Sequence, residues 1–307
     1  MSTLSTNNIV QYCLNTNFQK HCIGHIKYIK KIPLKEHEIL LDIDQDRVHI
    51  IDQHTKQDPL RLQFVSYLLS KTIPTLNLKC KIILNTGDGC NKQEQYTRLC
   101  FSCSFDSNHI QIPDPHIFQY FNFQDNIPFD QKQDRIIFVG SDTGTLDNEL
   151  LNERIRFCSL AQTSNHIYAK ISNFVHFNKE MLQHLNIKIN EISSNYISKE
   201  EQLKYKFILN ISGNTASWDR TPWGMKSNSY LINLESACKE YNWYYPIIES
   251  EGAIDTISVR DVLDKKYCYN ERKKQNQQKI ANSILKEHTH LDYFKQTLSL
   301  YNEIYNS

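Results

Sequence analysis

Two loops of small and polar residues, each followed by an arginine, have the composition expected of a binding site for a negatively charged group. The first is the glycine-flanked segment Gly140–Gly144, followed by Arg154, and the second is segment 212–217, followed by Arg220. A loop of small residues that opens a helix directs backbone N–H groups and the positive end of the helix dipole toward one point, which suits a phosphate. We interpret the two loops as two walls of one anion site, and we expect Ser217 to be the N-cap of the helix that follows the second loop.

The spacing of the glycines matches neither the GxGxxG dinucleotide pattern nor a P-loop. The alternative interpretation of segment 204–246 is an ordinary strand-helix-strand crossover with a buried tryptophan cluster, because all three tryptophans of the chain lie in it. We expect Trp223 and Trp243 to pack in the core. Trp218, beside the second loop, is the candidate to line a ligand pocket.

A single aspartate is the candidate for catalytic chemistry. Asp88 lies between Gly87 and Gly89, directly after the apolar run 79–85. In open α/β sheets, ligands bind beyond the carboxyl ends of strands, so this carboxylate is predicted to project into a site. The alternative is a plain turn, because Asp-Gly is a common turn dipeptide.

The pattern of apolar residues predicts alternating strands and helices. Strands are expected at 79–85, 99–105, 135–138, 171–177, 205–211 and 230–234, and helices at 58–73, 152–160, 178–185, 270–287 and 289–305. For the last helix, Thr289 to Asp292 forms a predicted capping box. The sequence therefore indicates an α/β protein with a cleft between two domains, which the polar segment 122–133 links.

Composition excludes several classes of function. The net charge of +1 provides no field that would attract nucleic acid, and no window of the sequence is apolar enough to suggest a membrane span. The N-terminal residues lack the features of a secretion signal, and the nine irregularly spaced cysteines suit reduced thiols in a cytoplasmic protein. Cys100 and Cys103 form a single CxxC pair without a second one, so we predict no metal site.

The order of these features resembles the family 90 glycosyltransferases, a group that includes capsule xylosyltransferases, protein O-glucosyltransferases and lipopolysaccharide-modifying enzymes. The strongest similarity runs from Glu200 to Phe207 and continues through Gly213, Ser217-Trp218, Arg220, 227–229 and Tyr245-Pro246. Weaker similarity covers 138–143 with Arg154, 101–104 with Ile112-Pro113, and the Asp88 turn. The resemblance spans roughly residues 80 to 260.

The resemblance implies a GT-B fold, in which two Rossmann-like domains face a cleft. We expect an N-terminal, acceptor-side domain at 1–128, a nucleotide-sugar-binding domain at 129–275, and C-terminal helices at 276–307 that pack back on the first domain. The implied activity is inverting transfer of a sugar from a UDP-sugar to an acceptor hydroxyl, with no essential metal or other cofactor. Asp88 matches the general base and Arg220 the arginine that faces the diphosphate. The implied donor-binding residues are Ser141, Arg154, Gly213, Asn214, Ser217, Trp218, Arg220, Ser229 and, for the ribose hydroxyls, Glu235.

The chain departs from the family pattern at one position that bears on the anion site. Val139 stands where the family usually has an arginine, and we expect Arg135 or Arg156 to supply that charge. The implied acceptor is a glycan or glycolipid of the lipopolysaccharide or capsule type, reached in the cytoplasm at the inner face of a membrane by peripheral association. The alternatives are a catalytically idle nucleotide-sugar or glycan-binding module on the same fold and a protein O-glycosyltransferase.

Overall fold

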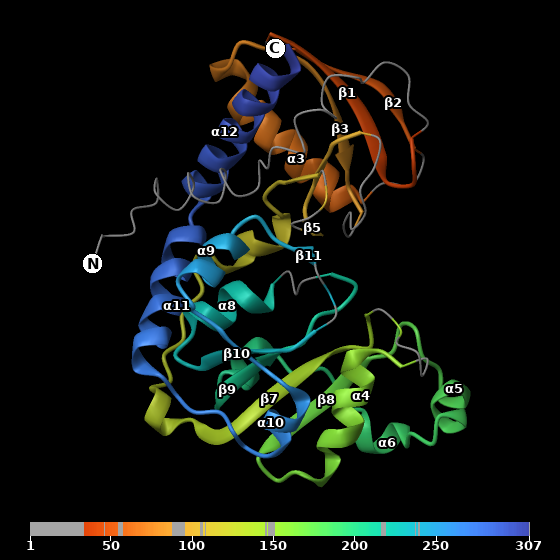
Figure 1. Ribbon diagram of the computed structural model, residues 1–307, viewed down its shortest axis with the longest axis vertical. Coiled ribbons are helices and arrows are strands. Elements are labelled where there is room, and N and C mark those ends of the chain that lie inside the picture. Colours follow the sequence, from red (N-terminus) through yellow and green to blue (C-terminus); the bar gives the residue numbers. More distant parts are fainter. Residues whose placement is uncertain are drawn as a thin grey trace. The chain divides into compact units, whose positions relative to one another are not determined.

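The computed structural model describes residues 34–45, 47–54, 58–87, 96–104, 107, 109–144, 146, 151–215, 219–236, 238 and 240–306. The chain divides into two compact units (Figure 1). Unit 1 consists of Met1–Phe121, Lys239–Ile247 and Ser283–Ser307, and unit 2 of Asn122–Cys238 and Ile248–Asn282. Each unit contains its own sheet with helices packed on it, so the protein is a mixed α/β protein.

The sheet of unit 1 is mixed in direction and follows the order β2-β1-β3-β4-β6. Its strands are β1 (Glu38–Gln45), β2 (Arg47–Gln53), β3 (Leu78–Asn85), β4 (Arg98–Cys100) and β6 (Ile110–Gln111). The first three strands are antiparallel neighbours, whereas β3, β4 and β6 run parallel. A separate short pair joins β5 (Cys103–Ser104) to β11 (Glu240–Tyr241).

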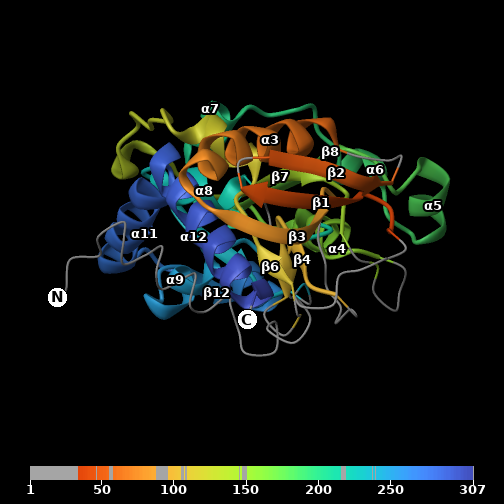
Figure 2. The same cartoon turned by 90° about the horizontal axis from the view of Figure 1, so that it is seen from above.

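Two helices pack against this sheet. Helix α3 (Pro59–Thr72) is capped by Asp58, whose carboxylate accepts a hydrogen bond from Arg61 N, and it is followed by the 3₁₀ helix η1 (Ile73–Thr75). Helix α12 (Glu287–Asn306) is fixed to β3 because Tyr301 Oη donates to the Lys81 carbonyl at 3.1 Å. Figures 1 and 2 both show α3 and α12 beside this sheet.

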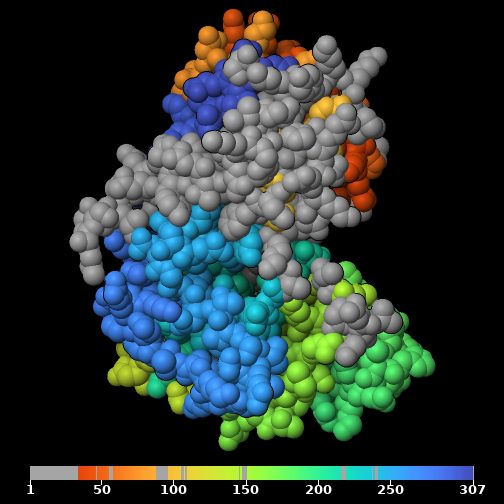
Figure 3. All heavy atoms as spheres, in the orientation of Figure 1, coloured from red at the N-terminus to blue at the C-terminus, as the bar shows by residue number. Residues whose placement is uncertain are grey.

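The sheet of unit 2 is entirely parallel and follows the order β12-β10-β9-β7-β8. Its strands are β7 (Gln133–Ser141), β8 (Ile167–Asn173), β9 (Tyr205–Asn210), β10 (Tyr230–Leu234) and β12 (Asp255–Ile257). The helices between its strands are α4 (Glu153–Leu160), α5 (Lys179–His184), α6 (Ile189–Ile192), α7 (Lys199–Gln202), α8 (Arg220–Lys226) and α9 (Tyr245–Ser250, which starts in unit 1). Two more follow the last strand, α10 (Val259–Leu263) and α11 (Glu271–Ile284, which ends in unit 1). In the space-filling view, α5 and α6 form the green edge of this unit (Figure 3).

The two faces of this sheet have separate packing partners. Phe138, Phe207 and Tyr230 lie on the face whose core includes Ile155 and Phe157 of α4. On the other face, Gln277 of α11 bonds both backbone groups of Leu231. A parallel sheet covered on both faces explains why its strands are almost continuously apolar.

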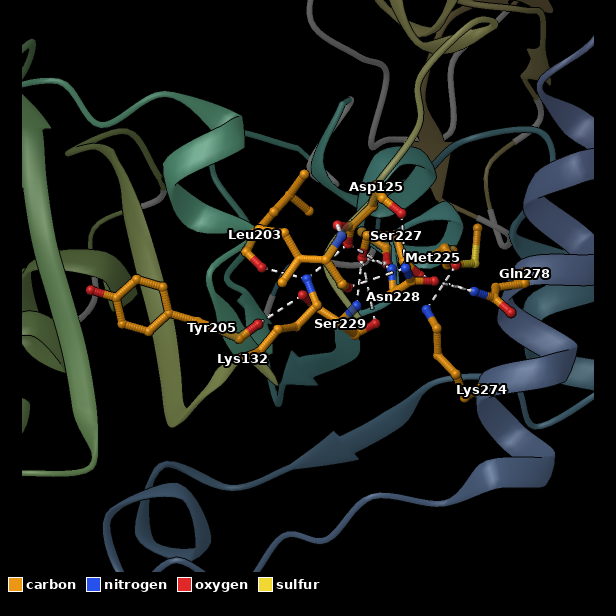
Figure 4. Close-up of polar contacts among 12 residues, drawn as sticks. Asp125, Lys132, Leu203, Tyr205, Met225, Ser227, Asn228, Ser229, Lys274 and Gln278 are labelled. Atoms are coloured by element: carbon orange, nitrogen blue, oxygen red, sulfur yellow. Dashed lines mark hydrogen bonds and ion pairs between the residues drawn. The ribbon is translucent and has the colours of Figure 1, made fainter. Parts of the chain in front are cut away.

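Segment 122–133, expected to link the domains, is anchored in unit 2. Its Asp125 carboxylate accepts hydrogen bonds from Lys132 Nζ and Asn228 N, both at 2.8 Å (Figure 4). The Asp125–Lys132 ion pair is almost completely buried, with side-chain exposures of 1% and 0%. This stretch is therefore part of the structure at the amino ends of the strands of unit 2.

Several predicted elements differ in their bounds. The predicted strand 99–105 is divided into β4 and β5 by a bend at Phe101 and Ser102, and the predicted strand 171–177 is replaced by β8, which ends at Asn173. The capping-box prediction is wrong, since α12 already begins at Glu287 and Thr289 lies inside it. No helix in the described part of the chain is both long and apolar enough to cross a bilayer.

Candidate functional site

The topology of unit 2 creates one natural binding position. Across the sheet the strands follow the order β8-β7-β9-β10-β12, which is 2-1-3-4-5 when they are numbered along the chain from β7. This is a doubly wound order, whose connections reverse direction between β7 and β9. Right-handed crossovers then place α4, which follows β7, and α8, which follows β9, on opposite faces of the sheet. Ligands of such sheets bind outside the carboxyl ends of the two strands at this reversal, called the switch point.

Arg154, from the first turn of α4, joins the ends of both strands at the switch point. Its Nη1 donates to the Ser141 carbonyl at 3.1 Å and to Thr143 Oγ1 at 2.7 Å, while its Nη2 donates to the Ile211 carbonyl at 2.9 Å. Its Nε lies 3.1 Å from the Ser212 carbonyl. The guanidinium thus binds the loop after β7 to the loop after β9, so its observed role is to hold the two loops together.

The two loops also contact each other directly. The backbone N–H of Gly144 donates to Asn214 Oδ1 at 3.0 Å, and Gly144 has a φ of 141°, a conformation that favours glycine. The Gly213 N–H donates to the Thr215 carbonyl at 3.0 Å, so this amide is engaged within its own loop. The two loops that the sequence analysis interpreted as walls of one site are therefore neighbours.

Arg220 is the first residue of α8 and reaches the switch point from the other face. Its Nη2 donates to the Val139 carbonyl of β7. Its guanidinium carbon lies 4.8 Å from the centroid of the Phe138 ring, and that of Arg154 lies 5.7 Å from the same centroid. Both distances allow cation–π attraction, so one aromatic ring helps to hold two like charges close together.

The electrostatics of this pair are those of a buried, positively charged cluster. Burial, together with the neighbouring charge of Arg220, lowers the pKa of Arg154 to about 10. Asp219 and Glu153 act in the opposite direction, and the Asp219 carboxylate itself pairs with Lys199 Nζ at 3.1 Å. Arg154 and Arg220 place two guanidinium groups at the carboxyl ends of β7 and β9, where they could make charge-assisted hydrogen bonds to an anion.

Two further predicted residues lie at the same edge. Ser141 ends β7, where its carbonyl accepts from Arg154. Glu235 follows the carboxyl end of β10, the next strand beyond β9, with its side chain exposed and its N–H donating to the Ile257 carbonyl at 2.8 Å. Glu235 is thus placed where a ligand extending from the switch point along the sheet edge would meet it.

Ser229 and Arg135 are not brought to this edge. Ser229 precedes β10, is fully buried, and donates through Oγ to the Tyr205 carbonyl at the start of β9 at 2.7 Å (Figure 4). Arg135 lies near the start of β7 and donates to the Ile167 carbonyl at the start of β8 at 3.1 Å. In a parallel sheet these positions are at the amino edge. Ser229 therefore links the starts of two strands, and Arg135 does not supply the positive charge that is missing at position 139.

Three predicted site residues, Asp88, Ser217 and Trp218, lie outside the described residues. The N-cap prediction is nevertheless corrected, since α8 begins at Arg220 with Asp219 as its N-cap, and Asp219 makes no side-chain capping hydrogen bond. Trp223 and Trp243 are buried, each with 1% exposure, as expected of core residues.

Sequence reasoning missed two residues that shape the site. Phe138 supports both arginines, but a phenylalanine in an apolar strand has no distinguishing signal. Asp142 is fully buried, and its carboxylate accepts hydrogen bonds from the backbone N–H groups of Val175, His176 and Phe177, two of them at 2.6 and 2.8 Å. Its position between two glycines resembles that of Asp88, yet its contacts are structural.

Comparison with known proteins leaves the family of the chain open. No protein-family model matches the sequence, and no curated protein matches it significantly. Cys100 and Cys103 are both buried and form no disulfide, and the described residues contain no group of three His, Cys, Asp or Glu side chains that could hold a metal ion.

Proposed function

We propose that the chain is a UDP-sugar-dependent inverting glycosyltransferase of the family 90 type, with a GT-B fold, acting on a hydroxyl of a glycan or glycolipid. One observation carries the proposal. Two buried arginines, one from each helix that leaves the switch point of unit 2, meet on Phe138 at the carboxyl ends of β7 and β9. The leaving group of such a transfer is a diphosphate, whose developing negative charge requires fixed positive groups.

In the proposed mechanism, the arginines have different roles. Arg220 faces the diphosphate and stabilises the charge on its leaving oxygen, whereas Arg154 keeps the loops after β7 and β9 in the geometry that receives it. The carboxylate of Glu235 accepts hydrogen bonds from the ribose hydroxyls. Asp88 takes the proton of the acceptor hydroxyl as its oxygen attacks the anomeric carbon, and the bond from that carbon to UDP breaks on the opposite side, which inverts the configuration.

The binding step is tested by calorimetry with UDP. We expect wild-type protein to bind UDP and Arg220→Ala to bind it at least tenfold more weakly, because a charge-assisted hydrogen bond contributes about 1.5–3 kcal/mol. Undiminished affinity in Arg220→Ala would place the phosphate site elsewhere. Thermal stabilisation by UDP-glucose, UDP-xylose, UDP-galactose and UDP-glucuronate then identifies the donor, since a ligand that binds the folded state raises the melting temperature.

The chemical step is tested at Asp88. We expect Asp88→Asn to lower turnover by about 10² to 10⁴ while leaving UDP affinity unchanged, because only the general base is removed. Unchanged turnover would refute this role. A wild-type protein that binds UDP and a UDP-sugar but transfers no sugar to any glycan or glycolipid acceptor would instead be the idle binding module.

A further inference from the structure

Unit 1 contains an apolar pocket that the proposed chemistry does not use. Its volume is about 310 Å³, and it lies between the β1–β2 hairpin and helix α3. The residues that line it are Ile39, Leu41, Val48, Ile50, Leu62, Val65, Ser66, Leu69, Ser70, Ile73, Pro74 and Leu84. This volume is at the lower end of the range for small-molecule sites, about 300–1,000 Å³.

The pocket exists because the sheet is wider than the helical layer beneath it. Ile39 and Leu41 of β1 are opposite Leu84 and Ile82 of β3, and these four side chains are buried. The next strand, β2, is at the edge of the sheet, and all seven of its residues are exposed. Its inward-facing Val48 and Ile50 remain 37% and 58% exposed although they line the pocket.

A β-bulge keeps a charge away from this face. The register between β1 and β2 shifts at Leu40/Leu41, so that Leu41 pairs with Ile50 but Leu40 pairs with Asp52. Ile51 is the extra residue. In a regular register, Ile51 would be opposite Leu40, and Asp52 would be opposite Ile39 and would face the pocket, whereas the bulge puts Asp52 opposite Leu40 on the other side of the sheet.

The lining offers almost nothing to a polar ligand. Among the described residues of the lining, the only polar side chains are two serines of α3, and both hydroxyls donate to carbonyls of their own helix, Ser66 Oγ to Leu62 at 2.9 Å and Ser70 Oγ to Tyr67 at 2.7 Å. None of these described residues is charged. A peptide or sugar placed here would leave its own polar groups without partners, which costs about 1–3 kcal/mol for each group, whereas a hydrocarbon chain would not.

We propose that this pocket binds a single hydrocarbon chain, the tail of a lipid whose polar head remains in solvent. The narrow volume accepts one chain, the described lining is apolar apart from two serines whose hydroxyls are engaged, and the exposed Val48 and Ile50 gain apolar contact when the chain enters. Together with the proposed function, on which this last step rests, the inference identifies the acceptor as a glycolipid bound through its tail in unit 1.

Adjacent residues of β2 provide a matched pair of variants. Ile50 lines the pocket and Ile51, the bulge residue, does not, yet they are similarly exposed at 58% and 50%. Because both side chains are largely in solvent, Ile50→Lys and Ile51→Lys should both fold, which circular dichroism and the melting temperature check. The ligands are hexanoate, octanoate, decanoate and dodecanoate, together with dodecyl maltoside as an uncharged head group, each below its critical micelle concentration in calorimetry.

We expect saturable binding with a stoichiometry of one chain per protein. Affinity should rise about fourfold for each added methylene until the pocket is filled, because each buried methylene contributes about 0.8 kcal/mol. Dodecanoate and dodecyl maltoside should bind similarly, since the lining recognises the tail. Ile50→Lys should weaken dodecanoate at least tenfold, and Ile51→Lys should bind it as the wild type does.

Three results would overturn the proposal: no saturable binding by the wild type, equal weakening in both variants, or affinity independent of chain length. Sedimentation of the same proteins tests whether a second copy of the chain occupies this face instead. Self-association that is abolished by Ile50→Lys but not by Ile51→Lys would show that the face is a contact between two copies. If the protein binds dodecanoate but not UDP, the proposed function is refuted and the pocket assignment stands. If it binds UDP but not dodecanoate, the pocket assignment is refuted and the proposed function stands.

Discussion

Gly213 and Arg154 fit together so closely that a Cβ atom on Gly213 would lie 2.9 Å from Arg154 Nη2. The same atom would lie 3.0 Å from Thr143 Oγ1, to which Arg154 also donates. Glycine therefore permits a close approach between the loop after β9 and Arg154, and a larger residue would displace the guanidinium from its position against the Ile211 carbonyl. This contact makes the geometry of the anion site depend on a residue that carries no functional group.

Gly213→Ala should consequently disturb the site without removing a charge. We expect UDP affinity to fall by about tenfold or more and the unfolding free energy to fall by about 1–3 kcal/mol, because an added methyl group in a packed region forces side chains to shift. Calorimetry and denaturant unfolding measure the two effects. Gly252→Ala is a control for the loss of a glycine elsewhere in unit 2, where an added Cβ meets no atom within 4 Å. Because Gly252 has a φ of 53°, Gly252→Ala can destabilise the protein only through backbone strain. Equal loss of UDP affinity in both variants would contradict the prediction.

Arg154 and Arg220 should respond differently to truncation. Arg154→Ala leaves the carbonyls of Ser141 and Ile211 without their donor, and we expect it to lower the unfolding free energy by about 2–4 kcal/mol. Arg220→Ala should mainly weaken UDP binding. Urea unfolding and calorimetry on both variants separate the roles, and a variant Arg154→Ala that is as stable as wild type would show that the loops are held by other contacts.

The neighbouring positions of the two loops could be predicted from sequence, because each loop follows an apolar run that forms a central parallel strand. The strand predicted at 171–177 failed for a reason that lies outside that segment. The Asp142 carboxylate binds the amides of Val175, His176 and Phe177, so these amides cannot join the sheet, although their side chains suit a strand. A tertiary contact therefore overrode local propensity.

The β1–β2 hairpin was equally hidden. Residues 1–56 were expected to form short strands ending in the alternating run 38–52, but no hairpin was predicted, since this run contains none of the Gly or Asn-Gly signals that usually mark a tight turn. Instead Gln45, at the end of β1, adopts a φ of 58°. The pocket of unit 1 depends on this hairpin and its bulge, so it could not be found before the strand pairing was known.

Ser229 and Glu235 test which edge of the sheet of unit 2 holds the ligand. Ser229→Ala removes a buried hydrogen bond to the Tyr205 carbonyl, so we expect a loss of about 1 kcal/mol in stability and no change in UDP affinity. Glu235→Gln, at the exposed carboxyl edge, should weaken UDP several-fold and leave stability within about 0.5 kcal/mol. Calorimetry with UDP and with inorganic diphosphate measures this, because only UDP has the ribose. The opposite pattern would place the site at the amino edge.

Lys274 of α11 connects protonation to the stability of unit 2. It is 3% exposed and donates to the Met225 carbonyl at 3.0 Å, and it lies in the electrostatic field of the buried pair Asp125 and Lys132 (Figure 4). Burial lowers the pKa of Lys274 to about 7, while Asp125 raises it and Lys132 lowers it further. In the unfolded chain, the pKa of a lysine is about 10.4.

The direction of the pH effect follows from these two pKa values. Between about pH 7 and pH 10 the unfolded chain binds a proton at Lys274 that the folded protein does not, so the contribution of Lys274 to the unfolding free energy rises with pH in this window. Below about pH 7 both states are protonated and the full cost of burying the charge remains. Lys274→Met removes that cost, and we expect it to be more stable than wild type by roughly 2–4 kcal/mol at pH 6, after the lost hydrogen bond is subtracted.

The advantage of Lys274→Met should shrink as the pH rises toward 10, where the wild-type lysine is neutral in the folded protein. Urea unfolding at a series of pH values measures this difference, and Lys279→Met, at an exposed position of the same helix, is the matched control, with an expected change within about 0.5 kcal/mol. The prediction fails if the difference in unfolding free energy between wild type and Lys274→Met does not depend on pH, or if Lys274→Met is less stable at pH 6. Either result would show that neighbouring groups fully offset the cost of burying the charged lysine.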